Sequence, residues 1–463
     1  DILVEIAPDV YKSYATKDKK GVKQLLVQCQ NALYGTMVAS LLYYCKFTKS
    51  LMEIGFELNP YDPCVANKMT EGKQMTICFH VDDCKLSHRT PKVMDKMIKW
   101  LRQEYESIFE DGSGEMTVSR GKVHTYLGMT LDYTVRGQVK ITMIGYVDEI
   151  LTAFDKADPK GRGTKTSAAP ENLFKIDEDC EKLPPNKAVE FHNLVAKTLY
   201  ATKRARPDTC TAIAFLTTRV RAPDKDDWTK LVHLMKYLRG TRTLPLILSA
   251  NGSGILKWWV DASFAVHPNM RGHSGGGLSL GRGFPIVSST KQKLNTRSST
   301  ENEIVGADDF MPAICWTRYF MEAQGYQVQD NILFQDNKSA ILLEKNGKAS
   351  SSKRTKHINI RYFFITDRVK AGDVSLVWCP TGDMIGDFMT KPLQGALFRK
   401  FRDQIMGVIP ARDPGPGKPK PGNGKSDTNK LKPRKGKRAN GSLVPLEGWH
   451  HRSVLGVVTK QTK

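Results

Sequence analysis

Four acidic residues in the second half of the sequence each stand beside a strongly apolar stretch, where negative charge is unfavourable unless cations neutralise it. They are Asp261, Glu303, Asp336 and Asp387. Mg²⁺ prefers carboxylate oxygens as ligands. Two such ions would activate a water and stabilise the leaving oxygen of an in-line displacement at phosphorus. The set therefore indicates a two-ion magnesium site that hydrolyses a phosphodiester.

The elements that must position these acids follow from the pattern of residues 255–405. We expect strands at 255–264, 275–280, 285–290, 332–336 and 374–380, and helices from about 299, from 337, over 355–370 and from about 383. This order predicts an α+β or mixed α/β fold whose central sheet carries the acids to one edge. Pro312 lies inside the first of these helices, where a proline costs about 3 kcal/mol. We expect a kink or break there, with Asp308 or Asp309 capping a second segment.

Each acid also has an ordinary structural interpretation, because an Asp at a strand end or helix start is most often a cap. Glu301 competes with Glu303, and Asp383 competes with Asp387, since the sequence places both members of each pair near the same helix start. The prediction of a metal site therefore depends on the whole set of acids.

The overall charge points to an anionic partner. The 463 residues include 70 Lys and Arg against 48 Asp and Glu, a net charge of +22. Such an excess is typical of proteins that bind nucleic acid, although a basic tail that only keeps the chain soluble would also produce it. No apolar run approaches about 18 residues, so we expect no membrane span and no membrane partner.

The cysteines and the first residue bear on the compartment. Nine Cys without a C-x-x-C spacing favour reduced thiols in an intracellular compartment, such as a cytoplasmic particle or the nucleus. The chain begins at Asp1 without a leader-like segment, so we expect a fragment or processed product.

Shifts in composition divide the chain. Turn formers and charges over 156–188 predict a linker, and apolar residues at three-and-four spacing over 189–249 predict packed helices. The stretch from Gly407 is dense in Pro, Gly and Lys, so we expect 407–463 to be a disordered basic tail. Its run KPRKGKR could hold nucleic acid or act as a nuclear-localisation patch, or the tail could be a solvated appendage.

Residues 255–405 resemble the RNase H domain of copia-type retrotransposon Pol polyproteins. The matching stretches are WVDASFA, SSTKQKLNTRSSTENEIVGA, FQDNKSAI, KRTKHINIRYFFITDRV and CPTGDMIGDFMTKPL. The resemblance implies a βββαβαβα order and hydrolysis of RNA in RNA–DNA hybrids, where the 2′-hydroxyl distinguishes the strand to be cut. It implies that Asp261, Glu303, Asp336 and Asp387 bind two Mg²⁺ ions. In the two competing pairs, the family's ligand in the first helix directly precedes an apolar pair, which favours Glu303 over Glu301, and the ligand in the last helix precedes an apolar pair and Thr-Lys-Pro, which favours Asp387 over Asp383. His357 is a frequent feature of these elements, for which we expect a structural or phosphate-contacting role.

The earlier part of the chain extends the resemblance. Residues 189–249, with FHNLVAKTLYATKRARPD, are similar to the segment that joins polymerase and RNase H in the same family, and residues 1–155 to the C-terminal part of its reverse transcriptase. In MTICFHVDDCKLS, two apolar runs flank Asp82 and Asp83, which a hairpin would present at its tip to hold Mg²⁺ against a triphosphate. The family's third polymerase carboxylate lies in a strand before DILVEIAPDVY, so we expect an incomplete polymerase site and no primer extension by this chain alone.

These observations together predict four parts. They are a partial reverse-transcriptase palm at 1–155, a linker with a helical thumb or connection segment at 156–249, an RNase H-like domain at 250–406 and the basic tail at 407–463. The resemblance implies RNA–DNA hybrids, RNA template, DNA and other element-encoded proteins as partners, and a role in transposition. The alternative is a catalytically silent, nucleic-acid-binding relic of a transposable element. A third hypothesis, a host nuclease unrelated to transposition, is weaker, because the polymerase-like HVDD hairpin argues against it.

Overall fold

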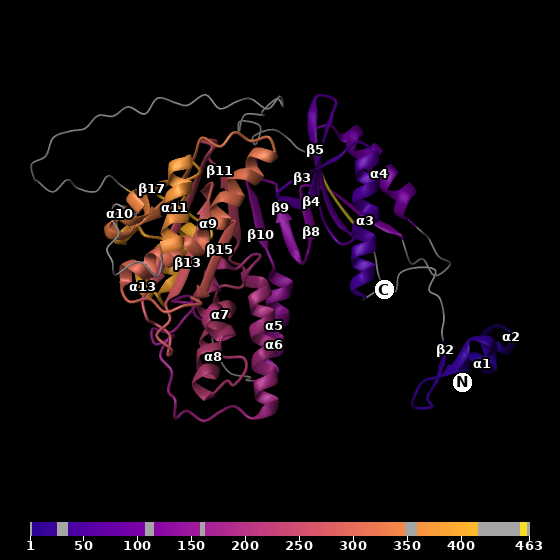
Figure 1. Cartoon of the computed structure of the whole chain (residues 1–463), viewed down its shortest axis with the longest axis horizontal. Coiled ribbons are helices and arrows are strands. Elements are labelled where there is room, and N and C mark those ends of the chain that lie inside the picture. Colours follow the sequence, from indigo (N-terminus) through magenta and orange to yellow (C-terminus); the bar gives the residue numbers. More distant parts are fainter. Residues whose placement is uncertain are drawn as a thin grey trace, which may run out of the picture.

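The computed structural model describes residues 2–25, 36–106, 115–157, 163–347, 359–414 and 454–460. Within these residues the fold is mixed α+β, with helices and four sheets, as the sequence predicts (Figure 1). The chain begins with α1 (Ile2–Ile6), α2 (Pro8–Tyr11) and a small hairpin of β1 (Ala15–Lys17) and β2 (Lys23–Leu25). None of the described helices is both long enough and apolar enough to cross a membrane.

The first large sheet carries the HVDD segment. Its strand order is β3 (Glu57–Asn59), β4 (Asp62–Thr70), β5 (Lys73–His80), β6 (Asp83–His88), β18 (Val454–Lys460) and β7 (Met116–Gly121). The helices α3 (Met37–Glu53) and α4 (Pro91–Tyr105) share one apolar core with it, because alternate residues of β5 point toward them. Phe47, Ile77 and Leu86 lie in that core.

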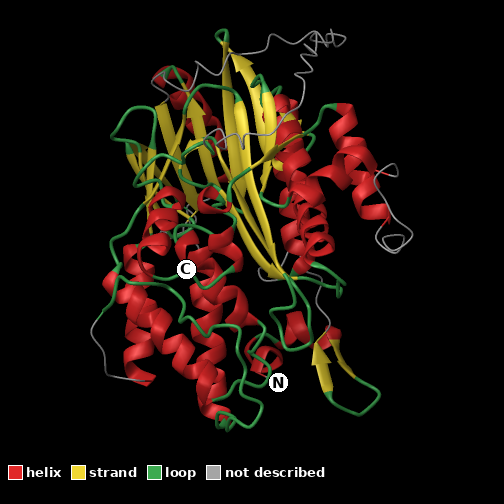
Figure 2. Ribbon diagram, turned by 90° about the vertical axis from the view of Figure 1, so that its left-hand side faces the viewer, coloured by secondary structure: helices red, strands yellow, loops and turns green. Residues whose placement is uncertain are grey.

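A second sheet joins strands from distant parts of the chain. Its order is β14 (Gly281–Arg282), β11 (Leu246–Ala250), β10 (Val139–Thr142), β9 (Met129–Asp132) and β8 (Val123–Tyr126). Below it in Figures 1 and 2 lie α5 (Ile144–Ala157), α6 (Pro185–Thr202), α7 (Cys210–Thr217) and α8 (Lys225–Gly240). The helices predicted over 189–249 are confirmed, since Phe191, Leu194 and Leu234 of their apolar faces are buried.

The third sheet positions the four acids. Its order is β15 (Ile286–Lys291), β13 (His273–Ser279), β12 (Ile255–Ser263), β16 (Asp330–Gln335) and β17 (Ser375–Trp378). The pairs among β15, β13 and β12 are antiparallel, whereas β16 pairs parallel with both β12 and β17. All five strands lie where the sequence predicts them.

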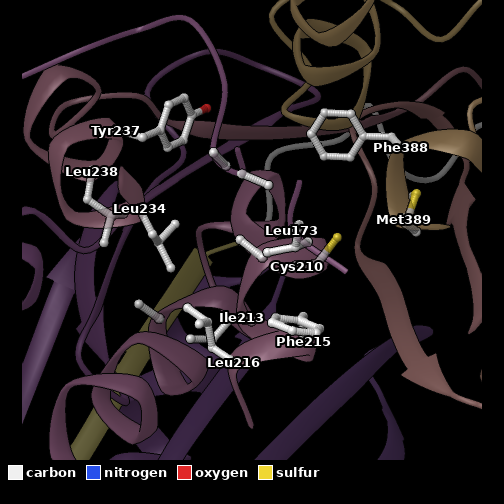
Figure 3. Packing of buried hydrophobic residues seen from close by; sticks show 14 of the residues in the cluster. Leu173, Cys210, Ile213, Phe215, Leu216, Leu234, Tyr237, Leu238, Phe388 and Met389 are labelled. Atoms are coloured by element: carbon white, nitrogen blue, oxygen red, sulfur yellow. The ribbon is translucent and has the colours of Figure 1, made fainter. Parts of the chain in front are cut away.

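Both faces of this sheet are covered. Trp258 of β12 packs in one core with α9 (Ser299–Ala323), α10 (Lys338–Asn346) and α11 (Asn359–Ala371). Its neighbour Trp259 packs in a second core, which also holds residues of α6, α7 and α8 and of α12 (Asp387–Thr390) and α13 (Gly395–Ile405). A short 3₁₀ helix, η5 (Thr381–Asp383), precedes α12. Figure 3 shows Phe388 and Met389 of α12 within the same buried cluster as Cys210 and Phe215 of α7.

The expected break at Pro312 is wrong. The helix α9 continues through Pro312 from Ser299 to Ala323, so Asp308 and Asp309 lie inside it and cap no second segment. Met311 before the proline and Ile314 after it pack in the core against the sheet, and that burial offsets the lost backbone hydrogen bond.

The end of the chain differs from the expected disorder in two places. Arg282 donates hydrogen bonds to the carbonyl oxygens of Gly407 and Val408, and Lys257 pairs with Asp413 at 2.5 Å. The Val-rich stretch of β18 pairs with β6 and β7 (yellow strand in Figure 1), as suits β-branched residues. The remainder of the tail, with KPRKGKR, lies outside the described residues, and so does His357.

Candidate metal centre

Three of the four predicted acids come together at one edge of the third sheet. Asp261, Glu303 and Asp336 each offer a carboxylate oxygen, and these oxygens all lie within 4.8 Å of one another. Asp261 belongs to β12 and Asp336 directly follows β16. The parallel register that pairs Trp259 with Phe334 brings these two acids level, and Glu303 reaches them from the start of α9.

Glycines allow the backbones around this group to approach closely. A Cβ atom at Gly306 of α9 would lie 3.0 Å from Cβ of Ala262, so α9 packs tightly on β12 beside Asp261. A Cβ atom at Gly386, just before α12, would lie 2.9 Å from Cβ of Asp261. The small residues therefore bring α9 and α12, with their acids, onto the same strand.

Asp387 joins the group through a lysine. The ammonium of Lys391 lies 2.6 Å from Oδ1 of Asp387 and 3.6 Å from Oδ2 of Asp261. The hydroxyl of Thr390 donates a hydrogen bond to the same Oδ2 of Asp261. Asp387 is thus adjacent to the triad of Asp261, Glu303 and Asp336 but is not a member of it.

Burial and mutual repulsion disfavour the charged forms of these acids. Desolvation, reinforced by Asp261, raises the pKa of Glu303 well above its ordinary value, and the same two causes raise the pKa of Asp336. Desolvation and then Asp261 raise the pKa of Asp387 to about 7, although Lys391 opposes that shift. Burial disfavours the ammonium of Lys391, but Asp261 and Asp387 outweigh it and raise the pKa of Lys391.

The residues fit a divalent cation that prefers oxygen ligands. Oε2 of Glu303 is buried and has no hydrogen-bond partner among the described residues. A buried carboxylate oxygen without a partner is costly, and a cation held by the triad would satisfy it. Mg²⁺, Mn²⁺ and Ca²⁺ all accept carboxylate ligands of this kind.

The two competing acids have other roles. Glu301 accepts a hydrogen bond from the backbone N–H of Arg297 at 2.8 Å, and its own N–H donates to Oγ of Ser298 at 3.2 Å. Ser298 is thus the N-cap of α9, and the Glu301 carboxylate binds the backbone of the residue just before that cap. Asp383, in η5, pairs with Lys400 at 3.0 Å. Neither acid belongs to the triad.

Asp82 and Asp83 lie in the first large sheet at the end of the β5–β6 hairpin. His80 pairs with Asp83, so Val81 and Asp82 form the turn, and Val81 adopts a left-handed φ of 55°. Burial and then the adjacent Asp82 raise the pKa of Asp83. Within the described ranges no third acid groups with these two closely enough for a metal site, and they are separate from the triad.

Two residues near the centre are missed by the sequence reasoning. Lys391 stands four residues after Asp387, a spacing that could have suggested an ion pair on one helical face. Glu344 of α10 is fully buried, and desolvation raises its pKa to about 8. Its surroundings in the sequence, LLEKNG, are typical of an ordinary helix end and carry no signal of burial.

No family model matches the chain. It is 26% identical over 391 residues to the retrovirus-related Pol polyprotein from transposon TNT 1-94 of Nicotiana tabacum, covering 83% of this chain and 28% of that protein. It is 25% identical over 411 residues to the Pol polyprotein from transposon RE2 of Arabidopsis thaliana, covering 87% and 27%. It is 23% identical over 391 residues to the Ty1-LR2 Gag-Pol polyprotein of Saccharomyces cerevisiae, covering 82% and 22%.

The chain therefore spans about a quarter of the length of the curated relatives it matches. The similarity extends over more than four fifths of the chain and includes elements from plants and yeast. The resemblance predicted from the motifs is confirmed, and the chain is homologous to a segment of copia-type retrotransposon Pol polyproteins.

Proposed function

We propose that the region around the metal centre is an RNase H-type endonuclease that hydrolyses the RNA strand of RNA–DNA hybrids with two Mg²⁺ ions. The observation that carries this proposal is the convergence of Asp261, Glu303 and Asp336 from β12, α9 and the end of β16. A structural cap needs one acid at one helix end, whereas these three share one small, buried space that favours cations. Relatives named Pol polyproteins support a nucleic-acid substrate.

The proposed roles follow from the contacts. Asp261, Glu303 and Asp336 would hold one ion, and Asp261 with Asp387 would hold the second. The ions would stabilise negative charge on the phosphate and favour ionisation of the attacking water. In the displacement the water oxygen bonds to phosphorus, the bond to the leaving sugar oxygen breaks, and that oxygen takes up a proton. Thr390 fixes the orientation of Asp261 through its hydrogen bond to Oδ2.

The net charge of +22 supports a polyanionic substrate, since Lys and Arg release counterions when they neutralise phosphates. For residues 1–155 we propose a partial polymerase palm, with Asp82 and Asp83 as Mg²⁺ ligands on the β5–β6 hairpin. Its expected inability to extend a primer alone stays a prediction, which a primer-extension assay on an RNA template would overturn if product formed with Mg²⁺.

Cleavage of a labelled RNA–DNA hybrid by the full chain tests the nuclease. We expect Mg²⁺-dependent cutting of the RNA strand that Asp336→Asn abolishes, because the substitution removes one of three converging charges. Asp383→Asn is the matched control, since this acid lies nearby but pairs with Lys400 and should leave cutting unchanged. Equal activity of Asp336→Asn and the unaltered chain would refute the site. Hybrid binding without any cleavage would favour the silent, binding-only alternative.

A further inference from the structure

We propose that Lys391 is a built-in counter-cation of the metal centre. Its ammonium stands between Asp261 and Asp387 when no divalent ion is bound there, and it moves away when the second ion binds. This inference deepens the proposed function. It rests on one part of that function, the binding of divalent cations by these acids, and it does not depend on which substrate is cut.

The ammonium lies where a second ion would be held. It contacts Oδ1 of Asp387 at 2.6 Å and Oδ2 of Asp261 at 3.6 Å, and Asp261 is also a member of the triad. An ion between Asp261 and Asp387 would therefore share a ligand with an ion in the triad, as in two-metal sites. An ammonium and a divalent cation repel strongly at such a distance, so both cannot occupy this position.

Lys391 can move, whereas the acids cannot. Its side chain is 40% exposed, but those of Asp261 and Asp387 are only 2% and 7% exposed. Lys391 also lines a small cleft together with Asp208, Thr211, Phe388 and Leu393. The lysine is therefore a rim residue that can leave the acids without repacking the core.

The backbone that carries Lys391 is held independently of its side chain. Three hydroxyls donate to successive carbonyl oxygens of α12: Thr211 to Phe388 at 2.5 Å, Ser289 to Met389 at 2.7 Å and Ser263 to Thr390 at 3.2 Å. These donors come from α7, β15 and β12. Removal of the ammonium should thus leave α12 in place and change only the charge between Asp261 and Asp387.

Lys391→Met tests the inference in the full chain, with Lys400→Met as a matched control. Lys400 has a similarly exposed side chain and pairs with Asp383 outside the centre. In chelator at pH 8, Lys391→Met should lower the melting temperature and Lys400→Met should not, because only the first leaves the buried acids without a cation. Calorimetric titration with Mn²⁺ should show about threefold to tenfold tighter binding at the second site of Lys391→Met, since the competing cation is gone.

A second substitution separates charge from packing. Asp387→Asn added to Lys391→Met should restore the melting temperature in chelator, which it could not do if the lysine acted only through its aliphatic stem. Mn²⁺ binding by Lys391→Met that is unchanged or weaker, or a lack of rescue by Asp387→Asn, would overturn the inference. If neither the unaltered chain nor Lys391→Met bound Mn²⁺, both this inference and the proposed nuclease would fail. Tighter Mn²⁺ binding without hybrid cleavage would refute only the nuclease.

Discussion

Replacement of Asp387 by Asn should stabilise the metal-free protein at pH 8 and not at pH 4. The pKa of Asp387 rises from an ordinary 3.8 to about 7 in the fold, because burial and Asp261 disfavour its charge. At pH 4 the carboxyl is largely protonated in the folded chain and half protonated in the unfolded chain, so its cost is small. Above pH 7 it is ionised in both, and the folded state bears the full cost of the buried charge.

The size of this cost follows from the pKa values. Each pKa unit corresponds to 1.36 kcal/mol, so a rise from 3.8 to about 7 destabilises the folded state by about 4 kcal/mol above pH 7. That pKa already includes the opposing attraction of Lys391, so the loss of this ion pair in Asp387→Asn needs no separate correction. The expected gain is about 4 kcal/mol, or roughly 8–16 °C in melting temperature for a unit of this size.

Thermal unfolding in chelator at pH 4 and pH 8 measures this difference, with Asp383→Asn as the control. Addition of Mg²⁺ at pH 8 should favour the unaltered chain over Asp387→Asn, because the variant lacks one of the proposed ligands. If Asp387→Asn were destabilised equally at both pH values, Asp387 would be an ordinary structural residue at a helix start, and the reasoning about the metal centre would be wrong.

Two further predictions concern the support of the centre. Glu344→Gln should stabilise the protein by about 2–4 kcal/mol at pH 9 and hardly at pH 5, because burial raises the pKa of Glu344 from 4.5 to about 8. The unaltered chain therefore loses stability as the pH rises from about 4.5 to about 8, where the carboxyl is ionised in the unfolded chain but still protonated in the folded one. Urea unfolding at both pH values would show a pH-independent difference if this were incorrect. Gly386→Ala should abolish both Mn²⁺ binding and hybrid cleavage, because the new Cβ would lie 2.9 Å from Cβ of Asp261. Gly382→Ala is the control: its new Cβ meets nothing within 4 Å, so this variant should retain both activities. Normal Mn²⁺ binding by Gly386→Ala would show that the close approach of α12 to β12 is dispensable.

The elements of the third sheet were predictable because their signals are local. Apolar runs bounded by turn residues mark β12 and β16, and both strands lie where these runs predict them. The distinction between Glu301 and Glu303 was also available in the sequence, since Ser298 and Glu301 have the spacing of a capping box, which leaves Glu303 for another role.

Features that depend on distant residues could not be predicted. The pairing of β10 with β11 joins strands on either side of the helical segment, and nothing in either strand specifies its partner. The helix α9 continues through Pro312 because tertiary burial of its neighbours outweighs a local preference. Lys391 is missed because a lysine four residues after an acid ordinarily forms a weak surface pair, and only the fold places Asp261 beside it.

The contacts of α12 tie the helical segment to the candidate metal centre. A four-residue helix cannot hold its own position, because it has too few internal hydrogen bonds to offset the entropy of ordering it. Here Phe388 packs among the buried residues of α7, and the hydroxyl of Thr211 caps its carbonyl oxygen. The acid Asp387 therefore owes its place as much to α7 as to the sheet that carries Asp261. It follows that Thr211, which is far from the acids in sequence, positions one side of the cluster, and that the helical segment and the sheet must fold together for Asp387 to reach Asp261.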